Sequence, residues 1–284
     1  MNDSIRLGFD AYYFQHPMTR MGQYAIQLWR ALTRRVDSGH RCLLAPAGVP
    51  AVEDEADDAT IVSASVPQLP DRVRKVWWEQ AGLPGARKRT DVDLVHIPYF
   101  TAPALDVGPL VVTIHDVIPL VLPAYAGSKM MRAYLRMNCK TVQRADLVLT
   151  GSEHSRCDIH ARLEIPLERI RVTPLAASHA FHPVQSEEDR DRVREIRERY
   201  GFGRPFVLYV GGFDRRKRLP ELIAAFALAN AQAGHRYDLV IAGSPHTGNR
   251  RLYPSITPEI KRWGIGDKVH LTGFVPDQDL PDLY

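Results

Sequence analysis

Short β-branched runs alternate along this chain with longer segments of helical period, and this alternation constrains the fold more strongly than any other feature. The N-terminal part has strand-like runs and helix-like segments at residues 4–13, 22–35, 91–98, 109–119, 128–145 and 145–152. A helix between two strands returns the chain to the same edge of a sheet, so the strands are predicted to be parallel. Helices would then cover both faces of the sheet, and the sequence predicts a doubly wound α/β fold.

The same alternation restarts after a strongly charged segment. Residues 185–201, QSEEDRDRVREIRERYG, are predicted to form a solvated helix next to a linker at His182–Gln185. Three more strands and one helix are predicted beyond it, at residues 205–212, 219–232, 237–244 and 267–274. The 284 residues are therefore expected to form two Rossmann-like domains, 1–183 and 184–284. The second is expected to be incomplete, with its open sheet edge completed by further residues or by a partner.

The composition is that of an ordinary soluble globular chain, with 45% hydrophobic and 25% charged residues. No run approaches the roughly 18 apolar residues of a membrane-spanning helix, and the start MNDSIRLGFD is unlike a secretion signal. A cytoplasmic location is therefore expected. The widely spaced Cys42, Cys139 and Cys157 favour neither a disulfide framework nor a thiolate metal site. The net charge of +4 favours an anionic partner.

Polar residues that follow the predicted strands are candidates for function, because ligands bind at the carboxyl ends of parallel strands. Gly22 opens a helix whose free N–H groups suit an anion, although an ordinary loop-to-helix turn explains it equally well. His115 ends a strand and titrates near neutral pH, whereas Asp116 beside it also suits a turn cap. Ser152 and Glu153 follow another strand, where they are candidates for a ligand cleft or for a helix cap.

The strongest signal is the basic turn YVGGFDRRKRLPELI at residues 209–223. Gly211 and Gly212 permit a tight turn with exposed N–H groups, and the four cations Arg215–Arg218 precede a predicted helix. Cations at a helix N-terminus oppose the helix dipole, so an anion such as a diphosphate is expected to bind there. A solvated basic turn is the alternative.

No metal site is predicted. Two aspartate pairs, Asp91/Asp93 and Asp277/Asp279, resemble an element that holds metal-bound sugar nucleotides in a different enzyme architecture. The first pair enters a strand and the second opens a helix, so turn and capping roles are expected instead. The eleven histidines are scattered without the spacing of metal ligands.

Six segments, taken in order, resemble the family 4 glycosyltransferases, and this similarity spans essentially the whole chain. They are TRMGQYAIQLWRAL, VVTIHDVIPLVLPAYA, VLTGSEHSRCDI, RVTPLAASHAFHP, VLYVGGFDRRKRLPELIAAFA and VHLTGFVPDQDLPDLY. The resemblance implies a GT-B architecture, in which two Rossmann-like domains bind a nucleoside diphosphate sugar. It also implies transfer of the sugar with retention of configuration, without a metal or another cofactor.

The resemblance also assigns roles to residues. Arg216 and Lys217 match the pair that binds the donor diphosphate, Gly22 matches a glycine near the phosphates, and His115 matches the histidine beside the transferred sugar. Gly212 belongs to the diphosphate turn. In the family, the departing phosphate takes the acceptor proton, so no protein base is expected. Family members continue into a Glu-x7-Glu stretch, and this chain is expected to be truncated before it. The remaining candidates for the acceptor side of the cleft are Asp116, Ser152 and Glu153.

Two basic stretches bear on the acceptor. Cations recur on one predicted helix face beside apolar residues, at Lys129, Arg132, Arg136 and Lys140 with Met131, Tyr134 and Leu135. LPDRVRKVWWEQ and GARKRT add cations around Trp77 and Trp78. Together they predict a peripheral contact with an anionic membrane at its inner face, where lipid-linked acceptors are found. A solvated helix face and a buried tryptophan pair are the alternative.

The expected function is therefore a glycosyltransferase of polysaccharide biosynthesis. Its partners would be a nucleotide sugar, with GDP-mannose preferred to UDP-sugars, and a glycan or lipid-linked acceptor, but not nucleic acid. A truncated, non-catalytic chain that binds acceptor and needs another subunit for the donor is the second hypothesis. A sugar-nucleotide epimerase shares the architecture but has no supporting motif here.

Overall fold

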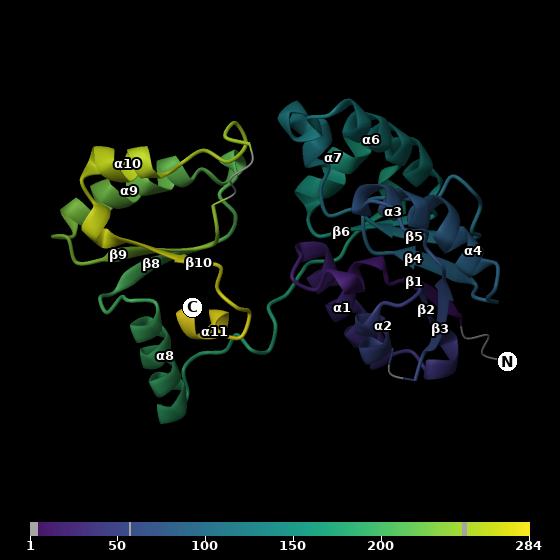
Figure 1. Cartoon of the computed structure of the whole chain (residues 1–284), viewed down its shortest axis with the longest axis horizontal. Coiled ribbons are helices and arrows are strands. Elements are labelled where there is room, and N and C mark those ends of the chain that lie inside the picture. The colour runs from purple at the N-terminus through teal and green to yellow at the C-terminus, as the bar shows by residue number, and fades with distance from the viewer. Residues whose placement is uncertain (1–4, 57, 246–248) are drawn as a thin grey trace. The chain divides into compact units, whose positions relative to one another are not determined.

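The structure is a computed structural model of the chain and describes residues 5–56, 58–245 and 249–284. The chain divides into two compact units, Met1–Leu175 and Ala176–Tyr284. Each unit has a parallel sheet with helices on both faces (Figure 1). The linker expected at His182–Gln185 lies in an irregular segment of the second unit, before its first helix.

Unit 1 is built on a sheet whose seven described strands have the order β3-β2-β1-β4-β5-β6-β7, with every pairing parallel. The strand order reverses between β1 and β4, as in the predicted doubly wound fold, and ligand crevices of such sheets lie at this reversal. The strands are β1 (Leu7–Asp10), β2 (Arg41–Pro46), β3 (Thr60–Ala64), β4 (Leu94–Ile97), β5 (Leu110–Thr113), β6 (Leu147–Thr150) and β7 (Ile170–Val172).

The helices of unit 1 lie on both faces of this sheet, with α1 and α2 on one side and α3, α6 and α7 on the other (Figure 1). The helix α3 continues through a π-helical turn, Trp78–Gly82, into α4. The helices are α1 (Arg20–Thr33), α2 (Pro50–Glu55), α3 (Asp71–Trp77), α4 (Leu83–Arg87), α5 (Ile118–Val121), α6 (Lys129–Thr141) and α7 (Glu153–Leu163).

Alternate side chains of β2 supply two different hydrophobic cores. Leu43 packs with Phe9 and Trp29 on the side of α1, whereas Leu44 packs with Trp78 and other residues of the opposite face. Because side chains of a strand alternate between faces, a strand with apolar residues on both faces must be covered on both. The burial of every residue from Arg41 to Pro46 follows from this position in the sheet.

Unit 2 has a smaller parallel sheet, whose described strands have the order β10-β9-β8. Alternate residues of β9 again reach two cores, since Leu239 and Ile241 pack with α9 and α10 while Val240 and Ala242 pack with α8 and α11. The elements are α8 (Glu187–Arg199), β8 (Phe206–Val210), α9 (Leu219–Gln232), β9 (Asp238–Ala242), α10 (Thr257–Trp263), β10 (Val269–Gly273) and α11 (Leu280–Leu283).

The charged segment expected to form a solvated helix is α8. Ser186 and Asp189 form a capping box at its start, and only Asp189 and Ile196 of the helix are buried. Three strands that the sequence pattern does not single out are also present, namely β2, β3 and β7. None of the helices described in either unit is both long enough and apolar enough to cross a membrane.

Candidate functional site

The carboxyl edge of the unit 2 sheet carries a glycine at the end of each strand. Gly211, Gly243 and Gly273 follow or end β8, β9 and β10, and all three have positive φ angles, of 154°, 151° and 72°. A Cβ atom on Gly243 would lie 2.1 Å from the carbonyl oxygen of Gly211, so the two loops approach more closely than any side chain permits. Of the two neighbouring glycines, Gly211 has the positive φ angle and the candidate Gly212 does not. The carbonyl oxygen of Gly212 accepts a hydrogen bond from the Tyr209 hydroxyl at 2.7 Å.

The basic turn follows β8 at this edge and forms one turn of 3₁₀-helix, Arg215–Lys217. Asp214 caps the turn, because its Oδ1 accepts from the backbone N–H of Arg216 at 3.2 Å. The same oxygen lies 3.1 Å from Nε of the Arg216 side chain. Lys217 Nζ makes no hydrogen bond or ion pair with any described residue. One cation is therefore held in place, and the next one along the chain is available to a ligand.

Arg218 differs from these two cations. It adopts the left-handed conformation, with φ of 57°, at the junction between the 3₁₀ turn and α9. Its guanidinium forms an ion pair with Glu221 at 2.6 Å, and 74% of its side chain is exposed. Arg218 is therefore a charge-matched neighbour of Arg216 that already has an acidic partner within the helix.

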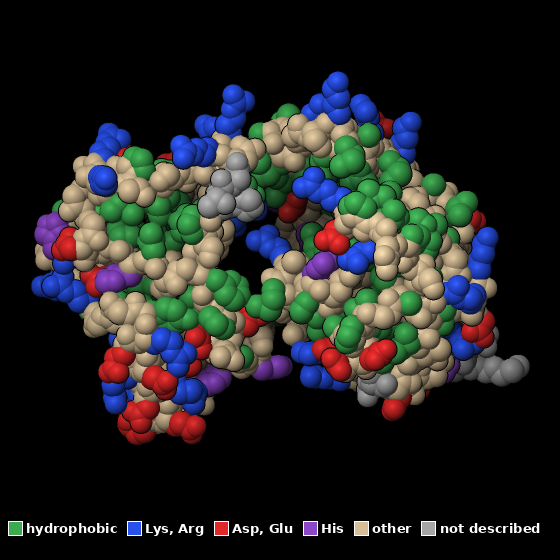
Figure 2. Space-filling view, viewed as in Figure 1, with side chains coloured by type: hydrophobic (Ala, Val, Ile, Leu, Met, Phe, Trp, Pro, Cys, Tyr) green, Lys and Arg blue, Asp and Glu red, His purple; other side chains and the backbone are tan. Residues whose placement is uncertain are grey.

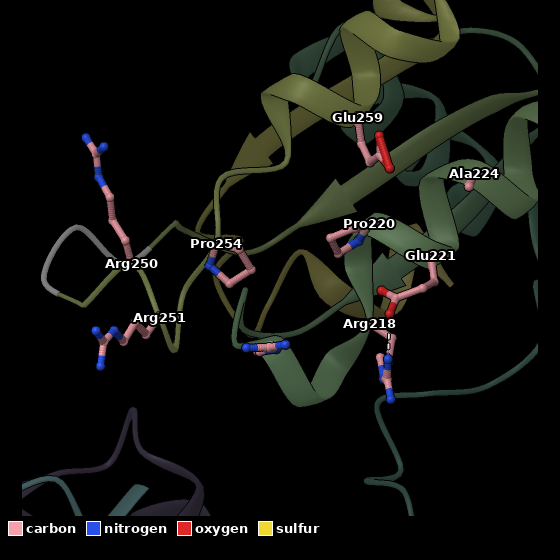
Figure 3. Close-up of a pocket in the computed structure, with 9 residues that line it drawn as sticks. Arg218, Pro220, Glu221, Ala224, Arg250, Arg251, Pro254 and Glu259 are labelled. Carbon is pink, nitrogen blue, oxygen red and sulfur yellow. Dashed lines mark hydrogen bonds and ion pairs between the residues drawn. The ribbon is translucent and has the colours of Figure 1, made fainter. Parts of the chain in front are cut away.

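A cavity of about 500 Å³ opens beside the turn (Figure 3). Residues three apart share a face of a 3₁₀-helix, and accordingly Arg215 and Arg218 line the cavity while Arg216 and Lys217 do not. Arg250 and Arg251 extend from their loop away from the acidic residues of the cavity (Figure 3). The full lining is Arg215, Arg218, Pro220, Glu221, Ala224, Arg250, Arg251, Pro254 and Glu259.

In unit 1, His115 lies two residues beyond β5, at the carboxyl edge of the sheet. Its ring packs edge-on against the ring of Tyr24 from α1, with centroids 4.4 Å apart. Burial lowers the pKa of His115, Asp116 opposes this shift, and Arg20 adds to it. Its Nε2 atom is buried and makes no hydrogen bond within the part of the chain that the structure describes. The site therefore presents a neutral imidazole with an unused polar atom, which suits a ligand hydroxyl.

Gly22 lies in the first turn of the neighbouring helix α1. Thr19 caps this helix and accepts the N–H of Gly22 at 3.1 Å. A Cβ atom on Gly22 would lie 2.1 Å from the carbonyl oxygen of His16, so only glycine permits the preceding loop to pack here. The structure thus supplies an internal reason for this glycine, and its role near the phosphates stays a prediction.

The other candidates of unit 1 have local partners. Asp116 Oδ1 accepts from the backbone N–H of Ile118 at 3.1 Å, as expected for a turn cap. Ser152 is the N-cap of α7, and its Oγ accepts from the N–H of Ser155 at 3.2 Å. Glu153 accepts a hydrogen bond from Arg156 at 3.2 Å. These contacts match the capping alternative, and a role in the cleft stays a prediction for all three.

A buried network at the strand-order reversal is absent from the sequence-based prediction. Asp10 ends β1 and is fully buried, and its carboxylate accepts from Tyr12 N at 2.9 Å, Trp78 Nε1 at 3.0 Å and the Tyr99 hydroxyl at 2.8 Å. Burial raises the pKa of Asp10 to about 6, and these hydrogen bonds lower it only in part. A carboxylate at the end of the first strand is visible in the sequence, but its partners are not.

The burial of Trp78 corrects the expectation that the tryptophan pair Trp77 and Trp78 belongs to a membrane-contacting surface. Trp78 is completely buried and Trp77 is half-buried, so the pair does not form an exposed aromatic surface.

In the described ranges, no group of three or more His, Cys, Asp or Glu side chains is arranged to hold a metal ion.

Comparisons with known proteins identify the family of this chain. The model of Glycosyltransferase Family 4 matches residues 21–181, and that of Glycosyl transferases group 1 matches residues 192–284. O-antigen chain mannosyltransferase B of Escherichia coli is 27% identical over 175 residues, 61% of this chain and 44% of that protein. Alpha-D-kanosaminyltransferase of Streptomyces kanamyceticus is 32% identical over 143 residues, 50% of this chain and 35% of that protein. The chain thus spans less than half the length of both relatives.

The fold is also found in solved structures. The crystal structure of Anabaena HepE in complex with UDP and glucose matches with a TM-score of 0.62 and 18% sequence identity, over 98% of this chain and 71% of that chain. Similarity of this kind, together with the two parallel sheets, confirms the expected GT-B fold.

Proposed function

Because the chain belongs to glycosyltransferase family 4, we propose that it takes part in the transfer of a sugar from a nucleoside diphosphate donor to a glycan or lipid-linked acceptor, with retention of configuration. The observation that carries this proposal is the basic turn at the end of β8. Asp214 holds Arg216 in place there, and Lys217 has no partner among the described residues. Two cations and a glycine-lined sheet edge suit a diphosphate.

The chemistry follows from charge. When the bond to the sugar breaks, negative charge grows on the departing diphosphate, and fixed cations stabilise it without further reorganisation. Arg216 and Lys217 perform this role in the proposed mechanism, and the departing phosphate takes the proton of the acceptor hydroxyl. No side chain acts as general base. His115, neutral because its pKa is lowered by burial, forms a hydrogen bond with a hydroxyl of the transferred sugar.

GDP-mannose is the proposed donor. The support is the similarity to a relative named O-antigen chain mannosyltransferase B. The proposed acceptor belongs to polysaccharide biosynthesis, and the exposed cations Lys129, Arg132, Arg136 and Lys140 of α6 are proposed to bring unit 1 to an anionic membrane.

The test is a calorimetric titration of GDP and UDP into the protein and into two single variants. Arg216→Ala is expected to cost about 1.5–3 kcal/mol of nucleotide affinity, the scale of a charge-assisted hydrogen bond. Arg218→Ala removes the same charge two residues away, but 74% of the Arg218 side chain is exposed, against 30% of that of Arg216, so its loss should be much smaller. Equal losses for the two variants would remove the assignment of Arg216. Transfer from GDP-mannose, followed by product analysis, then tests the reaction and its stereochemistry.

A further inference from the structure

An apolar groove lies between α3 and α6 on the surface of unit 1. It encloses about 650 Å³, and its apolar lining includes Val73, Val76, Met130, Met131 and Met137. Val73 is 45% exposed and Met130 is 59% exposed, and they line the same groove, so their exposed apolar surface is contiguous rather than scattered. Methionine side chains are flexible and polarizable, and they adapt to ligands of irregular shape. The groove therefore has the character of a site for an apolar chain.

Positively charged side chains lie at the groove on α3 and along α6 beside its lining. Arg72 is exposed on α3 and contributes to the groove lining. Along α6, the exposed residues Lys129, Arg132, Arg136 and Lys140 are accompanied by no acidic residue of that helix. The acids of the facing segment are already paired, since Asp71 contacts Arg74 at 2.9 Å and the buried Glu79 contacts Lys75. Charge complementarity therefore favours an anionic ligand over a neutral or cationic one.

The charge at the floor of the groove is balanced within the protein. Lys75 Nζ contacts Glu79, donates to the Tyr134 hydroxyl at 2.6 Å and lies 5.0 Å from the ring centroids of both Tyr99 and Tyr134. The charge of Lys75 is thus balanced within the protein. The cations that remain for a ligand are Arg72 and the exposed cations of α6. Through Tyr99, which donates to Asp10, the floor is continuous with the buried network at the strand-order reversal.

The direction of the helices places one end of the groove at the functional edge of the sheet. A helix that connects two parallel strands runs opposite to them, so α6 begins on the side where β5 ends. Ser128, Met130 and Met131 at the start of α6 therefore lie towards the edge that carries His115. A chain lying in the groove would leave its head group near that edge.

We propose that this groove binds the apolar chain of an anionic lipid, with the lipid phosphate held by Arg72 and by Lys129 at the start of α6, and that this lipid is the acceptor or its carrier. The second part rests on the proposed function, whereas binding of the lipid does not. A single lipid chain occupies the groove, which differs from adsorption of the whole surface to a membrane.

The experiment titrates alkyl phosphates into the protein at concentrations below micelle formation, without nucleotide. Dodecyl phosphate should bind at least tenfold more tightly than octyl phosphate, because each buried methylene contributes about fourfold. Met130→Glu should weaken the binding of dodecyl phosphate tenfold or more. Leu105→Glu is the matched control, since Leu105 is 54% exposed in the same unit and lies outside the groove, and it should change binding less than twofold.

Several results would overturn the proposal. They are equal losses for Met130→Glu and Leu105→Glu, equal affinity for the two alkyl phosphates, displacement by inorganic phosphate alone, or binding of dodecyl maltoside as tight as that of dodecyl phosphate. Binding to vesicles without binding of the monomeric probe would also overturn it in favour of surface adsorption. Since no nucleotide is present, failure here leaves the Arg216 titration untouched. If the Arg216 titration fails while dodecyl phosphate binds, the lipid site stands and the proposed sugar transfer does not.

Discussion

His115 combines a neutral imidazole with a buried Nε2 atom that makes no hydrogen bond with any described residue. If this atom binds the transferred sugar, His115→Ala should lower kcat about 100-fold while the Kd for GDP changes less than threefold, because the residue contacts the sugar and not the phosphates. Steady-state kinetics and calorimetry measure the two quantities. His154→Ala is the control, since the His154 side chain is 89% exposed in the same unit. Normal turnover in His115→Ala would reduce His115 to a structural residue.

Asp10 makes the stability of unit 1 depend on pH. Burial raises its pKa from 3.8 to about 6, so the folded protein binds this proton more tightly than the unfolded chain does. Stability that is fully present below about pH 4 is then lost as the pH rises to about 6, by about 3 kcal/mol at about 1.4 kcal/mol per pKa unit. An asparagine at this position keeps an acceptor for Tyr12 and Trp78 but has no charge to bury.

The prediction is therefore a difference between two pH profiles. The unfolding free energy of the wild type minus that of Asp10→Asn should fall by about 2.4 kcal/mol between pH 4 and pH 7. Urea denaturation at both pH values measures it. His96, whose pKa is lowered to about 4 by burial, imposes the opposite trend on both proteins and cancels in the difference. Parallel profiles would show that Asp10 is ionised throughout or that its cost is relieved in another way.

The sequence identifies some of these residues and cannot identify others, for a physical reason. The basic turn and His115 are recognisable because their residue types stand at strand ends, where ligands bind in parallel sheets. Two of the partners of Asp10, Trp78 and Tyr99, are 68 and 89 residues away, so the fold alone brings them together. Local geometry also cannot be read from residue types. The hydrogen bond between the Ser152 hydroxyl and the N–H of Ser155, and the close approach of the His16 carbonyl to Gly22, are seen only in the structure.

At the scale of elements, the alternation of strands and helices predicts the helices α1, α6, α8 and α9 and the strands β1, β4, β5, β6, β8, β9 and β10. It misses β2 because that strand is buried on both faces and has no alternating pattern, which leaves strand and helix indistinguishable over six residues. The edge strands β3 and β7 are missed for other reasons. Thr60, Ile61 and Ser63 of β3 are exposed, and β7 has only three residues.

The two roles considered for Ser152, capping of α7 and contact with a ligand in the cleft, can be distinguished by experiment. Ser152 caps this helix, so Ser152→Ala should lower the free energy of unfolding by about 1 kcal/mol, and Ser152→Asn should restore most of it because asparagine is an equally good cap. Denaturant unfolding of the three proteins measures this. A full loss of transfer in Ser152→Ala without a change in stability would assign the hydroxyl to the cleft instead.

At the scale of the whole molecule, charge is distributed unevenly over the helices. Lys and Arg side chains project along the side of unit 1 that α6 and α7 form, with hydrophobic side chains between them, whereas α8 carries acidic and basic side chains together (Figure 2). The net charge of +4 is therefore less informative than its location. A negatively charged surface would attract the face of α6 and would have little preference for α8.

This distribution leads to a prediction about membranes. The protein should float with vesicles that contain 30% phosphatidylglycerol, but not with vesicles of phosphatidylcholine alone, and the association should weaken with salt. Arg136→Glu combined with Lys140→Glu should reduce the partition coefficient by about 30-fold or more, at about 1 kcal/mol for each cation near the surface. Arg190→Glu combined with Arg194→Glu on α8 alters the net charge by the same amount and should have little effect, because those arginines already pair with Glu187 and Asp191. Equal losses for the two double variants would mean that net charge, and not the face of α6, governs the association.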